Sequence, residues 1–184
     1  MKPRQSNRER LYALMGDLHG LITLDMAKAV GVPAVEVRKL TARGALERAG
    51  RGVYRIPFAP ASDFEQVLIA LAEVGAGSVL VGTSVLALFD IGLEMPTKLA
   101  IAPSGRVRKQ LPAVVELSAI HPVAVETIEG VACESIFEIL SRRAEYARAD
   151  RVRDEIVRAE ELGFISSPQA KSLMSKVESK LSFK

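Results

Sequence analysis

Tryptophan is absent from this sequence, and only one of its 184 residues, Cys133, is a cysteine. A single cysteine excludes an intramolecular disulfide and a cysteine-rich metal site, so Cys133 is expected to be a small buried side chain. No apolar run reaches the roughly 18 residues that a membrane-spanning helix needs. The polar start MKPRQSNRER also lacks the apolar stretch of a signal peptide. We therefore expect a cytoplasmic globular protein without a membrane partner.

Residues that carry out catalysis are equally sparse. The two histidines, His19 and His121, are isolated and are expected to be structural. The stretch Gly-Thr-Ser at 82–84, followed by Asp90, resembles the opening of a nucleotidyltransferase motif. That chemistry needs two carboxylates two residues apart to hold Mg²⁺, and Gly92 stands where the second would be. The sequence therefore predicts no enzymatic activity, no metal site and no cofactor.

Positive charge is present, and it is unevenly distributed. Residues 1–60 carry 11 Lys and Arg against 5 Asp and Glu, a net charge of +6. Residues 61–184 carry 14 bases and 17 acids, a net charge of −3. A basic first third on a slightly acidic remainder is expected when one module of a protein meets a polyanion.

Hydrophobic spacing predicts three short helices followed by a hairpin in this basic part. A first helix is expected where apolar residues recur at i, i+3, i+4 and i+7, at Leu11, Leu14, Met15 and Leu18. Further helices are expected at 24–30 and 34–43, and short strands at 46–48 and 53–56. The two prolines of PFAPAS, residues 57–62, indicate a linker.

The helix expected at 34–43 would turn bases and small apolar side chains away from the core. On a helical wheel, Val37 and Leu40 face inward. The outward set is Val35, Arg38, Lys39, Ala42 and Arg43. Such a face suits a helix in a DNA major groove, where Arg38 can bind guanine while Lys39 and Arg43 can bind phosphates. The alternative is a solvated helix face, but such faces usually mix signs of charge.

The hairpin adds three more arginines, Arg48, Arg51 and Arg55. Arg51 lies at a Gly-Arg-Gly tip, which would let the backbone approach a phosphate or the minor groove closely. The helix and the hairpin together predict a winged helix-turn-helix that binds DNA.

Beyond the linker the pattern becomes mixed. Helices are expected at 64–75, 84–89, 134–147, 150–162 and after Pro168, and strands at 98–102, 114–120 and 123–128. The predicted fold class is α+β, with a winged helix-turn-helix domain at 1–57 and a mixed α/β domain at 63–184 that has a small sheet and C-terminal helices. A basic loop lies between two of these strands, at Arg106, Arg108 and Lys109. It is either a solvated loop or a second polyanion contact.

Three segments resemble the AbiEi family of antitoxins. The first runs from LITLDMAKAVGVP through VRKLTARGALERAGRGVYRIP, the second is SVLVGTSVLALFDIGLEMPTKLAIA, and the third is IEGVACESIFEIL. The chain departs from the family pattern at 82–84, where Gly-Thr-Ser replaces a segment with histidine, and in VACES, which lacks the usual proline. The resemblance covers roughly residues 8–148.

The resemblance implies an antitoxin of a type IV-like toxin–antitoxin system. Its winged helix would repress its own operon by binding inverted repeats in double-stranded promoter DNA, with self-association on the DNA as a further option. Its C-terminal domain would neutralise a cognate nucleotidyltransferase toxin, directly or indirectly. The residues alone leave an alternative open: a stand-alone winged-helix transcriptional regulator, or a protein-interaction module without a toxin.

Overall fold

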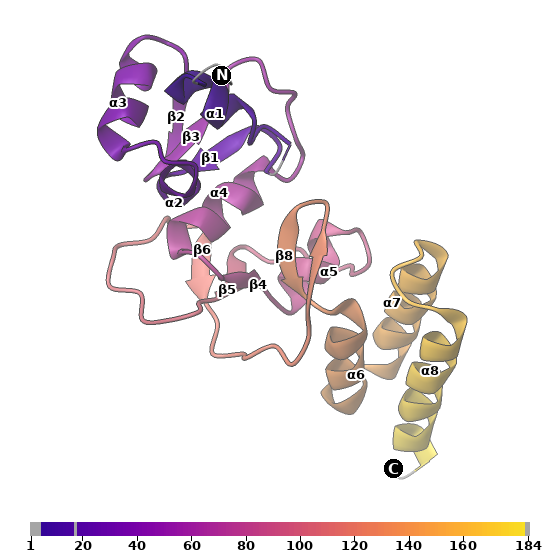
Figure 1. Cartoon of the computed structure of the whole chain (residues 1–184). Coiled ribbons are helices and arrows are strands. Elements are labelled where there is room, and N and C mark those ends of the chain that lie inside the picture. Colours follow the sequence, from indigo (N-terminus) through magenta and orange to yellow (C-terminus); the bar gives the residue numbers. More distant parts are fainter. Residues whose placement is uncertain (1–4, 17, 183–184) are drawn as a thin grey trace. The chain divides into compact units, whose positions relative to one another are not determined.

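The computed structural model of the chain describes residues 5–16 and 18–182 (Figure 1). They form two compact units. The first unit takes the chain up to Ser78, together with Pro103–Pro112 and Thr127–Val131, and the second unit takes the remainder. The stretch at 57–62, expected to be a linker, lies inside the first unit, because the helix that follows it packs against the sheet of that unit.

Short helices alternate with short strands in the first unit. Their order is α1 (Asn7–Tyr12), β1 (Leu21–Thr23), α2 (Leu24–Ala29), α3 (Ala34–Ala42), β2 (Glu47–Gly50), β3 (Val53–Arg55) and α4 (Glu65–Val74). The strands form an antiparallel sheet in the order β1-β3-β2. Helices α1 to α3 with this sheet make the winged helix-turn-helix that the sequence predicted.

Local signals explain where these helices begin and end. Ser6 and Glu9 form a capping box at the start of α1, and the Thr23 hydroxyl accepts from the Met26 N–H at 3.1 Å at the start of α2. Pro33 precedes α3, where its missing N–H is not needed. Helix α1 ends at Tyr12 and is shorter than the apolar spacing predicted. The predicted helix was too long because Leu14, Met15 and Leu18 lie in turns.

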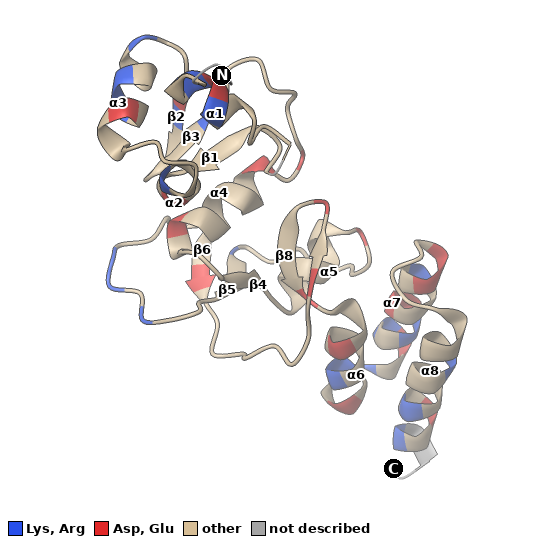
Figure 2. Ribbon diagram, in the orientation of Figure 1, with Lys and Arg blue, Asp and Glu red and all other residues tan. Residues whose placement is uncertain are grey.

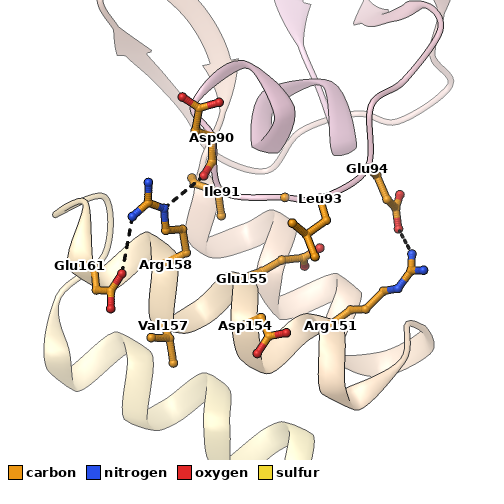
Figure 3. Close-up of a pocket in the computed structure, with 11 residues that line it drawn as sticks. Asp90, Ile91, Leu93, Glu94, Arg151, Asp154, Glu155, Val157, Arg158 and Glu161 are labelled. Atoms are coloured by element: carbon orange, nitrogen blue, oxygen red, sulfur yellow. Dashed lines mark hydrogen bonds and ion pairs between the residues drawn. The ribbon is translucent and has the colours of Figure 1, made fainter.

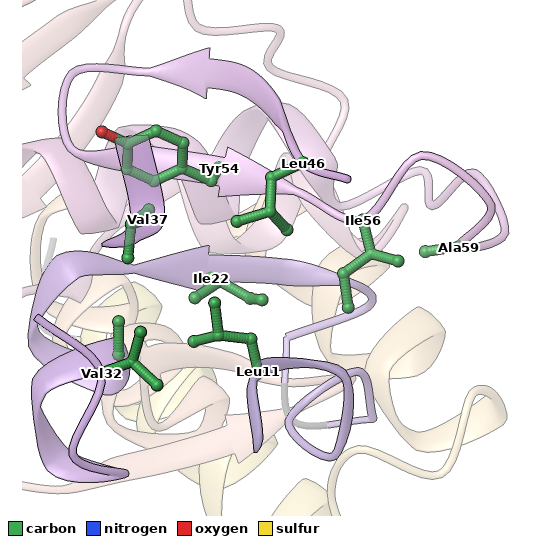
Figure 4. Close-up of a cluster of buried hydrophobic side chains, with 9 residues drawn as sticks. Leu11, Ile22, Val32, Val37, Leu46, Tyr54, Ile56 and Ala59 are labelled. Atoms are coloured by element: carbon green, nitrogen blue, oxygen red, sulfur yellow. The ribbon is translucent and has the colours of Figure 1, made fainter. Parts of the chain in front are cut away.

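The core of the first unit combines buried side chains of α1, α2, α3, β1 and β3 with others from the connecting segments (Figure 4). The labelled members are Leu11, Ile22, Val32, Val37, Leu46, Tyr54, Ile56 and Ala59. Burying each large aliphatic side chain stabilises the fold by about 1.5–3 kcal/mol. Because Val37 belongs to this cluster, the rotation of α3 about its axis is fixed by the core.

The second unit is built on a small sheet with helices after it. The elements after α4 are β4 (Val79–Leu80), α5 (Thr83–Leu88), β5 (Leu99–Ala102), β6 (Val115–Leu117), β7 (Val125–Ile128), β8 (Val131–Glu134), α6 (Ile136–Tyr146), α7 (Ala149–Glu161) and α8 (Ser167–Ser182). The end of β7 and the start of β8 fall in Thr127–Val131, which groups with the first unit. The strand order is β6-β5-β4-β8-β7, with β4 antiparallel to β5 and parallel to β8. Together the two units give the α+β class expected from the sequence.

Two ion pairs with buried carboxylates organise the second unit. The fully buried Glu134 accepts from the Arg142 guanidinium and from the Gly82 N–H at 3.0 Å. The hydrogen bond to Glu134 raises the pKa of Arg142 above its ordinary value. Arg143 donates to both carboxylate oxygens of Glu155, at 2.7 and 2.8 Å. Removing either arginine would leave a buried carboxylate without its ionic partner.

Cys133 is buried in β8, as a small apolar side chain should be. The helix expected at 134–147 begins at Ile136, because β8 occupies the preceding residues. None of the described helices combines the length and apolar character that crossing a membrane requires.

Candidate nucleic-acid interface

Helix α3 exposes the face that the helical wheel placed outward. Val37 is fully buried and Leu40 is half-buried on the inner side. The outward side chains are all exposed: Val35, Arg38, Lys39, Ala42 and Arg43. The core therefore turns a mixed basic and small apolar face to solvent, and contact of this face with DNA remains a prediction.

The bases on α3 differ in how firmly they are held. Lys39 Nζ lies 2.7 Å from Glu36 Oε1, one turn earlier, and this hydrogen bond lowers the pKa of Glu36. Arg38 has no hydrogen-bond or ion-pair partner in the part of the chain that the structure describes. Arg38 is therefore free to bind a ligand without breaking a contact of the fold.

The tip of the β2–β3 hairpin packs against α4. The Arg51 N–H donates to Glu73 Oε1 at 2.6 Å. A Cβ added at Gly50 would lie 2.7 Å from that same oxygen and 2.9 Å from Ile69 Cγ2. The sequence attributed the tip glycines to a close approach of DNA, but glycine at position 50 is required by α4. The Arg51 side chain itself is exposed.

Arg55 is used inside the fold. Its Nη1 donates to both Glu65 carboxylate oxygens, at 2.9 and 3.1 Å, and its Nη2 donates to the Ala59 carbonyl at 3.1 Å. Less than a quarter of the Arg55 side chain, 23%, is exposed. The guanidinium therefore joins β3 to the start of α4, and we leave Arg55 out of the candidate interface.

Arg48 on β2 is exposed, and its Nε donates a long hydrogen bond of 3.4 Å to the Gly50 carbonyl. Lys28 on α2, which the sequence interpretation passed over, is also exposed. It borders a shallow groove of about 500 Å³ at the turn between α2 and α3. The sequence signal that could have identified Lys28 is its place just before the turn that leads into α3, the helix expected to contact DNA bases. Figure 2 shows basic residues on each of α1, α2 and α3.

The second unit holds a groove between the segment 90–94 and α7, with a volume of about 400 Å³ (Figure 3). Arg151 on α7 forms an ion pair with Glu94 on the opposite side at 3.5 Å, and Arg158 and Glu161 form a pair within α7 at 3.6 Å. The described residues contain no cluster of three or more His, Cys, Asp or Glu side chains placed to hold a metal ion. The groove thus offers a surface of mixed charge and apolar character and no recognisable reaction centre.

Comparisons with known proteins give one family match, and it lies within the first unit. A search of curated proteins finds no match. Among solved structures, the crystal structure of the Rv2827c protein from Mycobacterium tuberculosis is similar, with 14% identity, a TM-score of 0.41, and coverage of 90% of this chain and 79% of that one. Residues 9–57 match the family described as transcriptional regulator, AbiEi antitoxin. Over these residues the chain is similar to the AbiEi antitoxin transcriptional regulators.

Proposed function

We propose that the protein is an antitoxin that represses its own operon and neutralises a nucleotidyltransferase toxin encoded alongside it. The observation that carries the DNA-binding part is the outward face of α3, where Arg38 is exposed and unpartnered among the described residues. The match of residues 9–57 to antitoxin regulators supports the same role. Such a protein acts in the cytoplasm, where its promoter lies.

Each part of the interface has a separate task in this proposal. The small side chains Val35 and Ala42 let α3 lie close to the bases, and Arg38 forks onto guanine O6 and N7. Lys39, Arg43, Arg48 and Arg51 bind phosphates, which fixes the position of the protein without reading sequence. Inverted repeats in the promoter would place two copies on neighbouring half-sites.

Promoter binding is tested by titrating a labelled fragment of the protein's own promoter. The test variant is Arg38→Ala/Lys39→Ala/Arg51→Ala, and we expect it to lose most of its affinity. The control is Lys98→Ala/Arg153→Ala/Lys171→Ala, which removes three bases from the second unit and the same net charge. Equal binding by the test variant and the wild type would contradict the proposal.

Neutralisation is tested by expressing the neighbouring nucleotidyltransferase gene with and without this chain. Growth should stop with the toxin alone and recover with the wild type. The Arg38→Ala/Lys39→Ala/Arg51→Ala variant should rescue growth equally well, because these residues serve DNA binding. Copurification of the two proteins distinguishes direct binding from indirect neutralisation.

A second candidate function has one observation in its favour, since the family match stops at residue 57 and leaves the second unit unmatched. In this reading the chain is a stand-alone winged-helix regulator, or a protein-interaction module. A neighbouring gene that is harmless when expressed alone, together with specific promoter binding, would favour the regulator. Absence of promoter binding would favour the interaction module.

A further inference from the structure

A basic loop outside the winged helix belongs to the first unit. Residues 103–112 join β5 to β6, yet they group with the winged helix. The segment contains three bases, Arg106, Arg108 and Lys109, and no acid. All three are exposed, and none has a hydrogen-bond or ion-pair partner among the described residues. Figure 2 shows this loop as a basic stretch.

The loop is fastened to the end of α4. Ser104 Oγ donates to the Ala76 carbonyl at 2.6 Å, just after the helix ends at Val74. Gly77 has a φ of +73° and faces Ser104, whose Cβ would lie 3.2 Å from a Cβ built at Gly77. The base of the loop is therefore held by backbone and hydroxyl contacts, which leaves its arginines and lysine unengaged.

The same end of α4 holds the tip of the hairpin. Glu73 accepts the Arg51 N–H, and Ala76 accepts the Ser104 hydroxyl. These two anchoring residues are three positions apart, which is at most about 10 Å along the chain. The hairpin tip and the basic loop are thus attached to neighbouring points of one element within the first unit.

We propose that the loop 103–112 contacts the phosphates of the DNA beyond the hairpin tip and lengthens the footprint of the winged helix. This inference rests on the proposed function, because it requires the winged helix to bind DNA. Phosphate contacts need accessible cations and no fixed side-chain geometry, and a loop with three bases and no acid meets that need. Residues 61–78, by contrast, bring three acids and no base to the unit, and the loop restores positive charge next to them.

The inference is tested with Arg106→Ala/Arg108→Ala/Lys109→Ala, with thermal melts to confirm folding. The dissociation constant for the promoter fragment is measured from about 50 to 200 mM salt. Each lost phosphate contact lowers the slope of log K against log salt by about 0.9, so the full loss is about 2.7. Preference between promoter and unrelated DNA should stay unchanged, because phosphate contacts carry no sequence information.

Varying the length of the DNA duplex provides a second test of the inference. On a duplex truncated at the flank that the loop would contact, the wild type should bind as weakly as the loop variant. The Lys98→Ala/Arg153→Ala/Lys171→Ala variant should keep the wild-type slope on every duplex. An equal loss in this control would show an effect of overall charge and would overturn the inference.

The outcomes separate the two proposals. A loop variant with wild-type affinity, slope and footprint overturns the inference, and the proposed function stands if Arg38→Ala/Lys39→Ala/Arg51→Ala still loses binding. If the loop variant binds DNA normally but no longer rescues growth from the toxin, the loop contacts a protein partner. This result also overturns the inference that the loop contacts DNA. Absence of DNA binding by the wild type removes both proposals.

Discussion

Helix α3 with its C-cap residue Arg43 and the β2–β3 hairpin each carry three bases and one acid, but the structure uses these bases differently. Among the described residues, Arg38 on the outward face of α3 has no hydrogen-bond or ion-pair partner, whereas the hairpin packs against α4. Glu73 accepts a hydrogen bond from the Arg51 N–H, and Glu65 forms an ion pair with the Arg55 guanidinium. A basic hairpin is therefore available to DNA only through the side chains that the following helix leaves unbound.

This difference between α3 and the hairpin predicts a different role for each in the proposed interface. On α3, small apolar residues next to Arg38 permit both close approach and base recognition. Of the three arginines in the hairpin, Arg48 and Arg51 are exposed and Arg55 is half-buried. We expect α3 to determine sequence preference and the hairpin to contribute phosphate contacts alone.

The largest expected effect on DNA binding comes from Arg38→Ala. It should weaken binding to the promoter site by about 1–3 kcal/mol and relax discrimination at one base pair. Lys39→Ala is the matched control on the same helix, and it should weaken binding to all sequences alike. Affinities for a set of single-base operator variants measure both effects. An Arg38→Ala profile parallel to that of wild type would remove base recognition from this residue.

Gly50→Ala should damage the hairpin by forcing it away from α4. The added methyl group would meet Ile69 Cγ2 at 2.9 Å and Glu73 Oε1 at 2.7 Å, and relief requires movement of the hairpin or of α4. Overpacking of this kind costs about 1–3 kcal/mol, measured as the free energy of unfolding in urea. Gly105→Ala is the control, because nothing lies within 4 Å of its added Cβ. Equal stability of the two variants would contradict the packing role of Gly50.

Arg55→Ala should lower stability and leave DNA binding unchanged. The ion pair with Glu65 is about three-quarters buried, and its loss should cost about 1 kcal/mol of unfolding free energy. A double-mutant cycle with Glu65→Ala isolates the pair. Under conditions where the variant is fully folded, its affinity for the promoter should equal that of wild type. A clear loss of affinity would return Arg55 to the interface.

The sequence predicted what depends on local patterns. The inward spacing of Val37 and Leu40 gave the orientation of α3, and the turn residues gave the hairpin. Strand β1 was missed because its three residues are too few for an alternating pattern. The partners of the hairpin were missed for another reason. Glu65 and Glu73 lie 10 and 22 residues from the groups that they bind, and no local pattern links them.

The smallest expected effect, and the most direct probe of the difference between α3 and the hairpin, comes from Glu73→Gln. The amide oxygen can still accept the Arg51 N–H, so the hairpin keeps its position, while one negative charge beside the proposed phosphate contacts is removed. We expect affinity for DNA to rise by about 0.5 kcal/mol, roughly twofold, at low salt and to fall back at high salt.

Asp63→Asn is the matched control for this change, because it removes an exposed acid of the same unit just before α4. An equal rise in affinity in both variants would show that only net charge matters. A rise in affinity confined to Glu73→Gln would show that the negative charge of Glu73 on α4 weakens phosphate binding at the hairpin tip. The acid that holds the hairpin in place would then also limit how strongly the hairpin binds phosphate, which leaves α3 to decide where the protein binds.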